Sequence, residues 1–151
     1  MKKWMVLIFP LAAALILSGC AGKSGGAPEP VDDKWGIALS AKDVTETGMT
    51  LVIFQRGGEP TGQLEYGSVY HLEVLNGGAW EAVPYAAGES VTWTMEAYMV
   101  PGNDSVEQKL TWDTLYGSLP AGTYRLCKEF MDFRGSGDYD TELYYAGFEL
   151  K

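Results

Sequence analysis

The chain has 151 residues, of which 11 are basic and 20 are acidic, so its formal net charge is −9. A chain of this length holds one domain of ordinary size. The acidic excess repels nucleic acid and anionic lipid, so we expect no nucleic-acid partner. The sequence has two cysteines, Cys20 and Cys127, and one histidine, His71, which excludes a CxxC motif and a site built from several histidines.

The N-terminus has the order of residues found in a secretory signal. Met1-Lys2-Lys3 is followed by an apolar stretch from Trp4 to Leu17, and the small residues Ser18 and Gly19 then precede Cys20. An apolar stretch of ~14 residues is shorter than the ~20 residues of a membrane-spanning helix. The sequence Leu-Ser-Gly-Cys at its end resembles the lipobox of bacterial lipoproteins.

The lipobox resemblance implies that residues 1–20 act as a lipoprotein signal peptide, that the chain is cut before Cys20, and that its thiol is lipidated. The expected location is the extracytoplasmic face of the cell membrane, where two or more acyl chains, such as palmitate, give a stable anchor. The alternatives are an ordinary signal peptide with an unrelated cysteine, or an uncleaved anchor. With Cys20 joined to lipid, Cys127 has no partner for an intramolecular disulfide.

Residues 21–30 consist of Gly, Ser, Ala and Pro with one Lys and one Glu, and they lack large apolar side chains. This composition predicts a flexible tether rather than a folded segment. At full extension the tether spans only ~33 Å, so we expect the domain to lie near the membrane. Residues 31–151 form the predicted single domain, and they show no internal repeat.

Strand-like segments recur about every ten residues along this domain, separated by Gly, Asn, Asp and Pro, as in a sandwich or a barrel. No segment keeps an apolar period of 3.6 residues, although one helical turn is expected near Asp113–Gly117. The predicted strands are Trp35–Leu39, Met49–Gln55, Ser68–Leu75, Ala79–Val83, Val91–Met99, Ser105–Trp112, Thr123–Met131 and Glu142–Leu150.

Two local patterns add detail to these strands. Asn76-Gly77-Gly78 predicts a tight hairpin, because type I′ turns need residues that adopt positive φ. Tyr70 and Leu72 alternate with polar residues, which predicts a strand with one buried face. His71 and Glu73 are expected on its wet face.

Residues 112–130, Trp-Asp-Thr-Leu-Tyr-Gly-Ser-Leu-Pro-Ala-Gly-Thr-Tyr-Arg-Leu-Cys-Lys-Glu-Phe, resemble the signature of a family of bacterial immunoglobulin-like domains. The same pattern is fitted by residues 66–73, Trp80, Pro84 and residues 100–102. The resemblance implies an all-β fold, an immunoglobulin-like β-sandwich of about seven to eight antiparallel strands. The family is typical of lipoproteins of Gram-positive anaerobes and brings no established activity, so it implies a fold and a location but no site.

The signature also has a direct structural interpretation. Pro120-Ala121-Gly122 is expected to turn the chain, and the Tyr124 hydroxyl to reach back to a carbonyl near Leu119, as in a tyrosine corner. Two residues after that tyrosine, where antibody domains carry a disulfide cysteine, the chain has Leu126. Packing must therefore replace a disulfide between the sheets, and the large contributors expected are Trp80, Trp93 and Trp112.

Nucleophilic catalysis has few candidate residues in this chain. His71 is the single possible triad base, Ser68 lies three residues away, and no Gly-x-Ser-x-Gly elbow occurs. A histidine exposed on a strand is the favoured interpretation. Cys127 is a nucleophile only if its thiolate is stabilised, and a small packed side chain is favoured instead.

The C-terminal region holds the remaining candidates. Asp138, Asp140 and Glu142 alternate in a predicted hairpin loop, where clustered oxygens suit calcium, but a solvated acidic loop without metal is favoured. Tyr139, Tyr144 and Tyr145 lie close in sequence to Phe148, and an aromatic patch there would bind a sugar or a protein. In a strand Tyr144 and Tyr145 face opposite sides, so one of them is expected to be exposed.

Three functions remain open. The favoured one is a membrane-tethered, extracytoplasmic module with a protein-binding or structural role in the cell envelope, anchored by lipid on Cys20. The second is a module that binds carbohydrate or a wall polymer. The third, a small envelope hydrolase acting through a pair of carboxylates, is disfavoured because nothing singles out one pair. We expect no cofactor, and we expect that the protein is not an enzyme.

Overall fold

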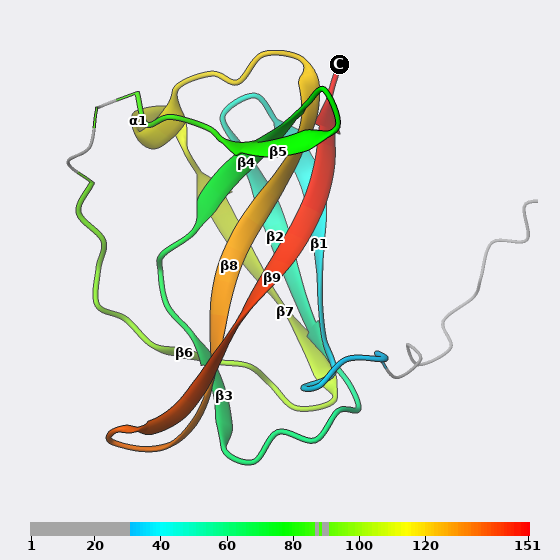
Figure 1. Cartoon of the computed structure of the whole chain (residues 1–151), viewed down its shortest axis with the longest axis vertical. Helices are drawn as coiled ribbons and strands as arrows, with labels where there is room; N and C mark the ends of the chain where they lie inside the picture. The colour runs from blue at the N-terminus through cyan, green and yellow to red at the C-terminus, as the bar shows by residue number, and fades with distance from the viewer. Residues whose placement is uncertain (1–30, 87, 89–90) are drawn as a thin grey trace, which may run out of the picture.

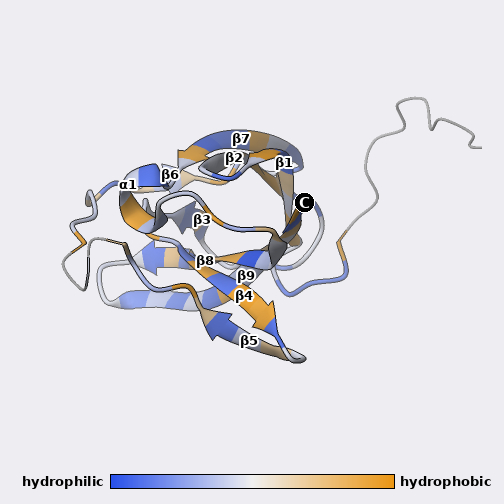
Figure 2. Cartoon of the chain, turned by 90° about the horizontal axis from the view of Figure 1, so that it is seen from above, coloured by the Kyte–Doolittle hydropathy of each residue, from blue (hydrophilic) through white to orange (hydrophobic). Residues whose placement is uncertain are grey.

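The computed structural model describes residues 31–151 except 87 and 89–90. In these residues nine strands form two antiparallel sheets, and Figure 2 shows β1, β2 and β7 on one side and β8, β9, β4 and β5 on the other. The prediction of an all-β sandwich is confirmed. Within the same residues, no helix is long and apolar enough to cross a membrane. The predicted signal and tether, with Cys20, lie outside them.

The smaller sheet has three strands in the order β1-β2-β7. Their bounds are β1 Ile37–Thr45, β2 Gly48–Gln55 and β7 Asp104–Thr111. Along the central strand β2, Met49, Leu51 and Ile53 face the core and are fully buried, whereas Val52 and Phe54 on the other face are half-buried. This difference arises because only one face of β2 is covered by the second sheet.

The larger sheet is arranged around β8, Gly122–Gly135, which pairs with β9, Asp138–Leu150, along one edge. The other edge of β8 pairs with β4, His71–Asn76, and with β3, Gln63–Tyr66. Two short strands extend the sheet: β5, Ala79–Ala82, beside β4, and β6, Tyr98–Met99, beside β3. Figure 1 shows β8 and β9 running the length of the molecule, with β4 and β5 at one end and β3 at the other.

Two strand predictions were wrong. The predicted strand Val91–Met99 pairs only at Tyr98–Met99, and β3 was not predicted. Trp93 lies in the unpaired part and packs edge-on against Tyr70, with ring centroids 5.3 Å apart. Trp93, one of the residues that suggested a strand there, therefore contributes to side-chain packing without belonging to a strand.

The expected turns are confirmed. Gly77 and Gly78 both adopt positive φ, 57° and 87°, between β4 and β5, as the type I′ turn requires. The helical turn predicted near residue 113 is α1, Asp113–Tyr116. Tyr124 donates a hydrogen bond of 2.8 Å to the carbonyl of Pro120, which makes the tyrosine corner one residue later than expected.

The core lies between the sheets and includes two tryptophans. Trp112 is fully buried, as predicted, and its ring stacks on Phe148. Trp35 is also buried but was not predicted as a core residue. Trp80 was wrongly assigned to the core, because it is 37% exposed on the outside of the larger sheet.

Two charged side chains of β8 also point inward. The ammonium of Lys128 donates to the carbonyls of Gly67, at 2.7 Å, and Val69, at 3.3 Å, and burial lowers its pKa to about 8. Burial alone would raise the pKa of Asp132, but hydrogen bonds from Thr61 and Gly62 to the carboxylate outweigh it, so that pKa lies below its usual value. Both charges are therefore satisfied mainly by backbone groups.

The N-terminal segment of the domain is fixed to the last strand. One carboxylate oxygen of Asp33 accepts hydrogen bonds from the backbone N–H groups of Trp35 and Ile37 and from the hydroxyl of Tyr144, the last at 2.7 Å. Burial opposes the ionised form, but these hydrogen bonds prevail and lower the pKa of Asp33. The start of β1 is thus held beside β9.

Candidate functional site

One side of the larger sheet faces away from the core, and we call it the outer face. Because side chains alternate along a strand, Arg125, Cys127 and Glu129 of β8 point to this side. The strand register adds His71 and Glu73 from β4 and further residues from β5 and β9. The outer face is made of His71, Glu73, Leu75, Trp80, Arg125, Cys127, Glu129, Tyr139, Leu143 and Tyr145.

Large apolar side chains are exposed on the outer face. Tyr139 is 50% exposed, Leu143 49%, Tyr145 45% and Trp80 37%. Single exposed apolar residues are normal, but these four share one side of one sheet. This arrangement gives the domain a surface suited to contact with another molecule.

Arg125 organises the centre of the outer face. Its guanidinium lies between two aromatic rings, 4.5 Å from the ring centroid of Trp80 and 4.2 Å from that of Tyr145. Its Nε donates a hydrogen bond to Glu73 on the neighbouring strand. Each cation–π contact contributes about 0.5–1 kcal/mol at an exposed site. The stack therefore holds both rings in place on the outer face.

Beside this stack lie His71, Glu73 and Cys127. His71 is the direct partner of Cys127 in the register of β4 and β8, and Glu73 follows His71 on the same face of β4. A ligand atom of each residue lies within 4.8 Å of those of the other two. His71 and Cys127 are separate candidates in the sequence, because no local signal shows which residue of β4 lies opposite Cys127.

The thiol of Cys127 is not arranged as a nucleophile. It points to the outer face, yet the residue is fully buried beneath its neighbours. Burial and the negative charge of Glu73 raise the pKa of Cys127 to about 12. Glu73 behaves in the opposite way: burial would raise its pKa, but the hydrogen bond and charge of Arg125 lower it. The geometry supports the interpretation of Cys127 as a packed side chain.

A serine triad is also not formed around His71. The hydroxyl of Ser68 donates to the carbonyl of Thr94 at 2.6 Å, so it is directed away from the histidine. The imidazole of His71 instead lies 3.8 Å from a carboxylate oxygen of Glu73. The exposed strand histidine favoured from the sequence is therefore the better description.

The acidic residues of the C-terminal hairpin are divided between two cations. Arg134 contacts Asp138 at 2.8 Å and Asp140 at 3.0 Å, whereas Glu142 pairs with Lys34 at 3.1 Å. A calcium ion bound by all three carboxylates would have to displace both cations. The geometry does not favour such a site.

The predicted aromatic patch is split between the two faces of β9. Tyr139 and Tyr145 are exposed on the outer face, and the exposure of Tyr145 confirms the prediction that one of Tyr144 and Tyr145 faces solvent. Tyr144 points inward, where it donates to Asp33 and packs edge-on against Phe130. Phe148 is buried in the core. Tyr144 therefore belongs to the interior and is not a ligand-binding residue of the surface.

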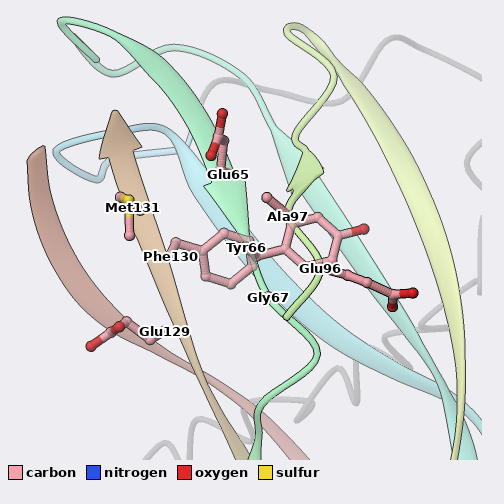
Figure 3. A pocket seen from close by; sticks show the side chains of 8 residues that line it. All are labelled: Glu65, Tyr66, Gly67, Glu96, Ala97, Glu129, Phe130 and Met131. Carbon is pink, nitrogen blue, oxygen red and sulfur yellow. The ribbon is translucent and has the colours of Figure 1, made fainter. Parts of the chain in front are cut away.

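A small cavity of about 140 Å³ opens between β3, β8 and the chain before β6. Figure 3 shows the rings of Tyr66 and Phe130 at its centre, with the carboxylates of Glu65, Glu96 and Glu129 pointing in three different directions. A hydrolase acting through two carboxylates needs them to face one bond. This cavity does not provide that geometry.

Comparison with known families identifies the domain. A model of the bacterial Ig-like domain family matches residues 33–148, which is more than half of the chain. The chain belongs to this family. No curated protein and no solved structure matches it. Membership confirms the immunoglobulin-like fold that residues 112–130 predicted.

This Ig-like domain has no disulfide between its sheets within the residues described. Cys127 is a free thiol on the outer side of β8, whereas Leu126 occupies the inward position. The prediction that packing replaces the disulfide is consistent with the buried Trp112, Phe130 and Phe148. Lipidation of Cys20 remains a prediction, because that residue lies outside the described chain.

Proposed function

We propose that this Ig-like domain is anchored by lipid on Cys20 at the extracytoplasmic face of the cell membrane and binds a protein partner through its outer face. The observation that carries the binding role is the exposed Trp80, Tyr145 and Leu143 beside Arg125. Aromatic and arginine side chains dominate the binding energy of protein interfaces. The basic N-terminus, apolar stretch and lipobox support the anchor.

The charge of the outer face indicates the chemistry of the partner. Strands β4, β5 and β9 contribute no lysine or arginine, and β8 contributes only Arg125 to this side. Carboxylates of Glu73 and Glu129 lie on the same face, and the whole chain is acidic. We therefore expect a partner protein whose contact surface has an apolar centre and a basic rim, which favours fast association at low salt.

A glycan is the less favoured ligand. Sugars bind aromatic side chains by stacking on a ring face, but Arg125 covers one face of both Trp80 and Tyr145. Tyr139 lies apart from this stack, at the hairpin end of β9. The face thus lacks a pair of open rings at its centre.

Site-specific photo-cross-linking in cells tests the binding role. A photo-reactive amino acid at Leu143 on the outer face is compared with one at Ser105, an exposed position on the smaller sheet. We expect one protein to be captured from Leu143 but not from Ser105, and less of it in an Arg125→Gln background. The captured protein, once purified, should bind the domain more weakly as salt is raised.

Other outcomes of this experiment contradict the proposal. Equal capture from both positions, or binding that is insensitive to salt, indicates a contact that does not use the outer face. A glycan adduct at Leu143 supports the carbohydrate-binding alternative instead.

Cell fractionation and mass spectrometry test the anchor. The wild-type chain should be recovered in the membrane fraction with an acylated Cys20 as its first residue. The Cys20→Ala chain should lose this modification and the processing that depends on it. An unmodified Cys20, or a chain that still begins at Met1, contradicts the proposed anchor.

A further inference from the structure

We propose that His71, Glu73 and Cys127 form a binding site for a thiophilic divalent metal ion such as Zn²⁺. This site does not depend on the proposed protein-binding function. The stack of Trp80, Arg125 and Tyr145 engages only one of these three ligands, through one carboxylate oxygen of Glu73.

The strand register brings the three ligands together. Directly opposed residues of antiparallel strands have Cβ atoms about 4.5–5.5 Å apart, which is the relation of His71 to Cys127. Glu73 is two residues from His71, so both project from the same side of β4. The three ligand atoms already lie within 4.8 Å of one another, and Nε2 of His71 is 3.8 Å from Oε1 of Glu73.

Only small movements are needed to close this arrangement on a metal. Zinc binds sulfur at about 2.3 Å and nitrogen or oxygen at about 2.0–2.2 Å, so ligand atoms of a tetrahedral site are roughly 3.3–3.8 Å apart. The largest gap must therefore shrink by about 1 Å. The side chain of His71 is 43% exposed, and it can turn toward the thiol without disturbing the core.

The donor set selects the type of metal. Thiolate sulfur and imidazole nitrogen favour zinc and other late first-row ions, whereas calcium and magnesium require oxygen ligands. Zinc usually has four ligands, so three protein ligands leave one coordination position free. That position would face solvent beside the exposed side chain of His71. The site is therefore open rather than closed on all sides.

Metal binding requires the proton of Cys127 to leave. A sulfur–metal bond replaces the S–H bond, and the proton passes to solvent, with no change of oxidation state. One thiolate and one carboxylate then face the two positive charges of the ion, and the carboxylate keeps its ion pair with Arg125. Because a proton is released, affinity should rise with pH.

Arg125 acts as a positioning residue for this site. It holds one carboxylate oxygen, Oε2, of Glu73, which leaves Oε1 facing His71. Hydrogen-bonded partners of this kind orient metal ligands and commonly change affinity by about 10–100-fold. The ion pair thus fixes the direction of the carboxylate even though Arg125 does not touch the metal.

Cobalt titration of the full chain in detergent is the first test. A Cys20→Ala background makes Cys127 the single thiol of the chain. We expect one equivalent of Co²⁺ to produce a thiolate-to-cobalt charge-transfer band in the near ultraviolet, and Zn²⁺ to remove it. Apparent affinity should increase between pH 6 and pH 8, in keeping with proton release.

Matched variants assign the ligands. Cys127→Ser should abolish the charge-transfer band, and His71→Gln and Glu73→Gln should weaken binding by at least about tenfold. Glu129→Gln, a change on the same face outside the site, should leave binding unchanged. His71 is an exposed side chain, so its variant keeps the proposal testable even if the Cys127 variant does not fold.

The single histidine provides an independent readout. One equivalent of Zn²⁺ should shift the only imidazole resonances in the NMR spectrum. The proposal is overturned if no charge-transfer band forms at millimolar cobalt, if Cys127→Ser binds as well as the parent, or if the imidazole signals do not move.

Discussion

The two faces of β8 place charged residues in different environments. On the inner face, Lys128 and Asp132 are fully buried and bind mainly backbone groups, which belong to the fold itself. On the outer face, Arg125 binds a carboxylate and two aromatic rings, all of them side chains. Backbone partners cannot be exchanged without unfolding, whereas side-chain partners can be exchanged for a ligand. The inner charges are therefore part of the fold, whereas the outer charge lies where a ligand could replace its partners.

The largest effect is expected from an apolar residue of the inner face. Phe130 is fully buried and packs against Tyr66 and Tyr144, so Phe130→Ala should lower the free energy of unfolding by about 4 kcal/mol. Trp80→Ala, a larger truncation on the outer face, should cost only about 1 kcal/mol. Urea denaturation measures both. Equal losses would remove the distinction between the faces.

The pH dependence of stability isolates Lys128. Burial lowers the pKa of its ammonium from 10.5 to about 8, so the unfolded chain binds more protons than the folded chain between these values. The free energy of unfolding of the wild type should therefore rise relative to Lys128→Met as pH increases from 8 to 10.5, by roughly 3 kcal/mol in total.

Cys127 and the buried tyrosines titrate at high pH in both chains, so their effects cancel in this difference. Urea denaturation at several pH values from 7 to 11 gives the measurement. A difference that stays constant over this range would show that Lys128 is not desolvated.

Acid should reveal the contribution of Asp132. Its lowered pKa means that the carboxylate stabilises the folded chain at neutral pH, and that this stability is lost as pH falls through the folded value. Asp132→Asn should cost about 2 kcal/mol at pH 7 and much less at pH 3. Asp138→Asn, at an exposed ion pair, should change stability by less than about 0.5 kcal/mol. A loss of unfolding free energy in Asp132→Asn that is the same at pH 7 and pH 3 would contradict this account.

The smallest effect on stability is expected at Arg125. Arg125→Gln removes two cation–π contacts and one ion pair near the surface, so the free energy of unfolding should fall by about 1 kcal/mol or less. Capture of the partner should nevertheless decrease several-fold. Lys42→Gln, which removes an exposed ion pair with Glu107 on the smaller sheet, is the control. A large loss of stability without loss of binding would assign Arg125 to the fold.

Local sequence signals predicted much of the fold because they act over a few residues. The two glycines after β4, the proline turn before Tyr124 and the alternation around Leu72 each depend on local backbone preferences. The strand β3 was missed because Gln63–Tyr66 is only four residues long and gains its pairing from β8. Trp80 was misplaced because a tryptophan on a short edge strand can face either side.

The candidate site could be predicted only in part, because it depends on register. The exposure of one of Tyr144 and Tyr145 follows from alternation along a single strand. The proximity of His71 to Cys127 instead depends on how β4 aligns with β8, more than 50 residues later in the chain. A shift of one residue would place a different side chain beside the thiol. The ring of Tyr145 over Arg125 depends in the same way on the register of β9.

The pairing of β1 with β2 affects how the domain would bear mechanical load. Figure 1 shows the start of β1 at one end of the sandwich and the C-terminus, at the end of β9, at the other. Tension between these ends is directed along the strand axes, across the hydrogen bonds that join β1 to β2. These bonds would be sheared together instead of opened one after another. The domain is thus built to resist stretching along its length more strongly than peeling from one edge.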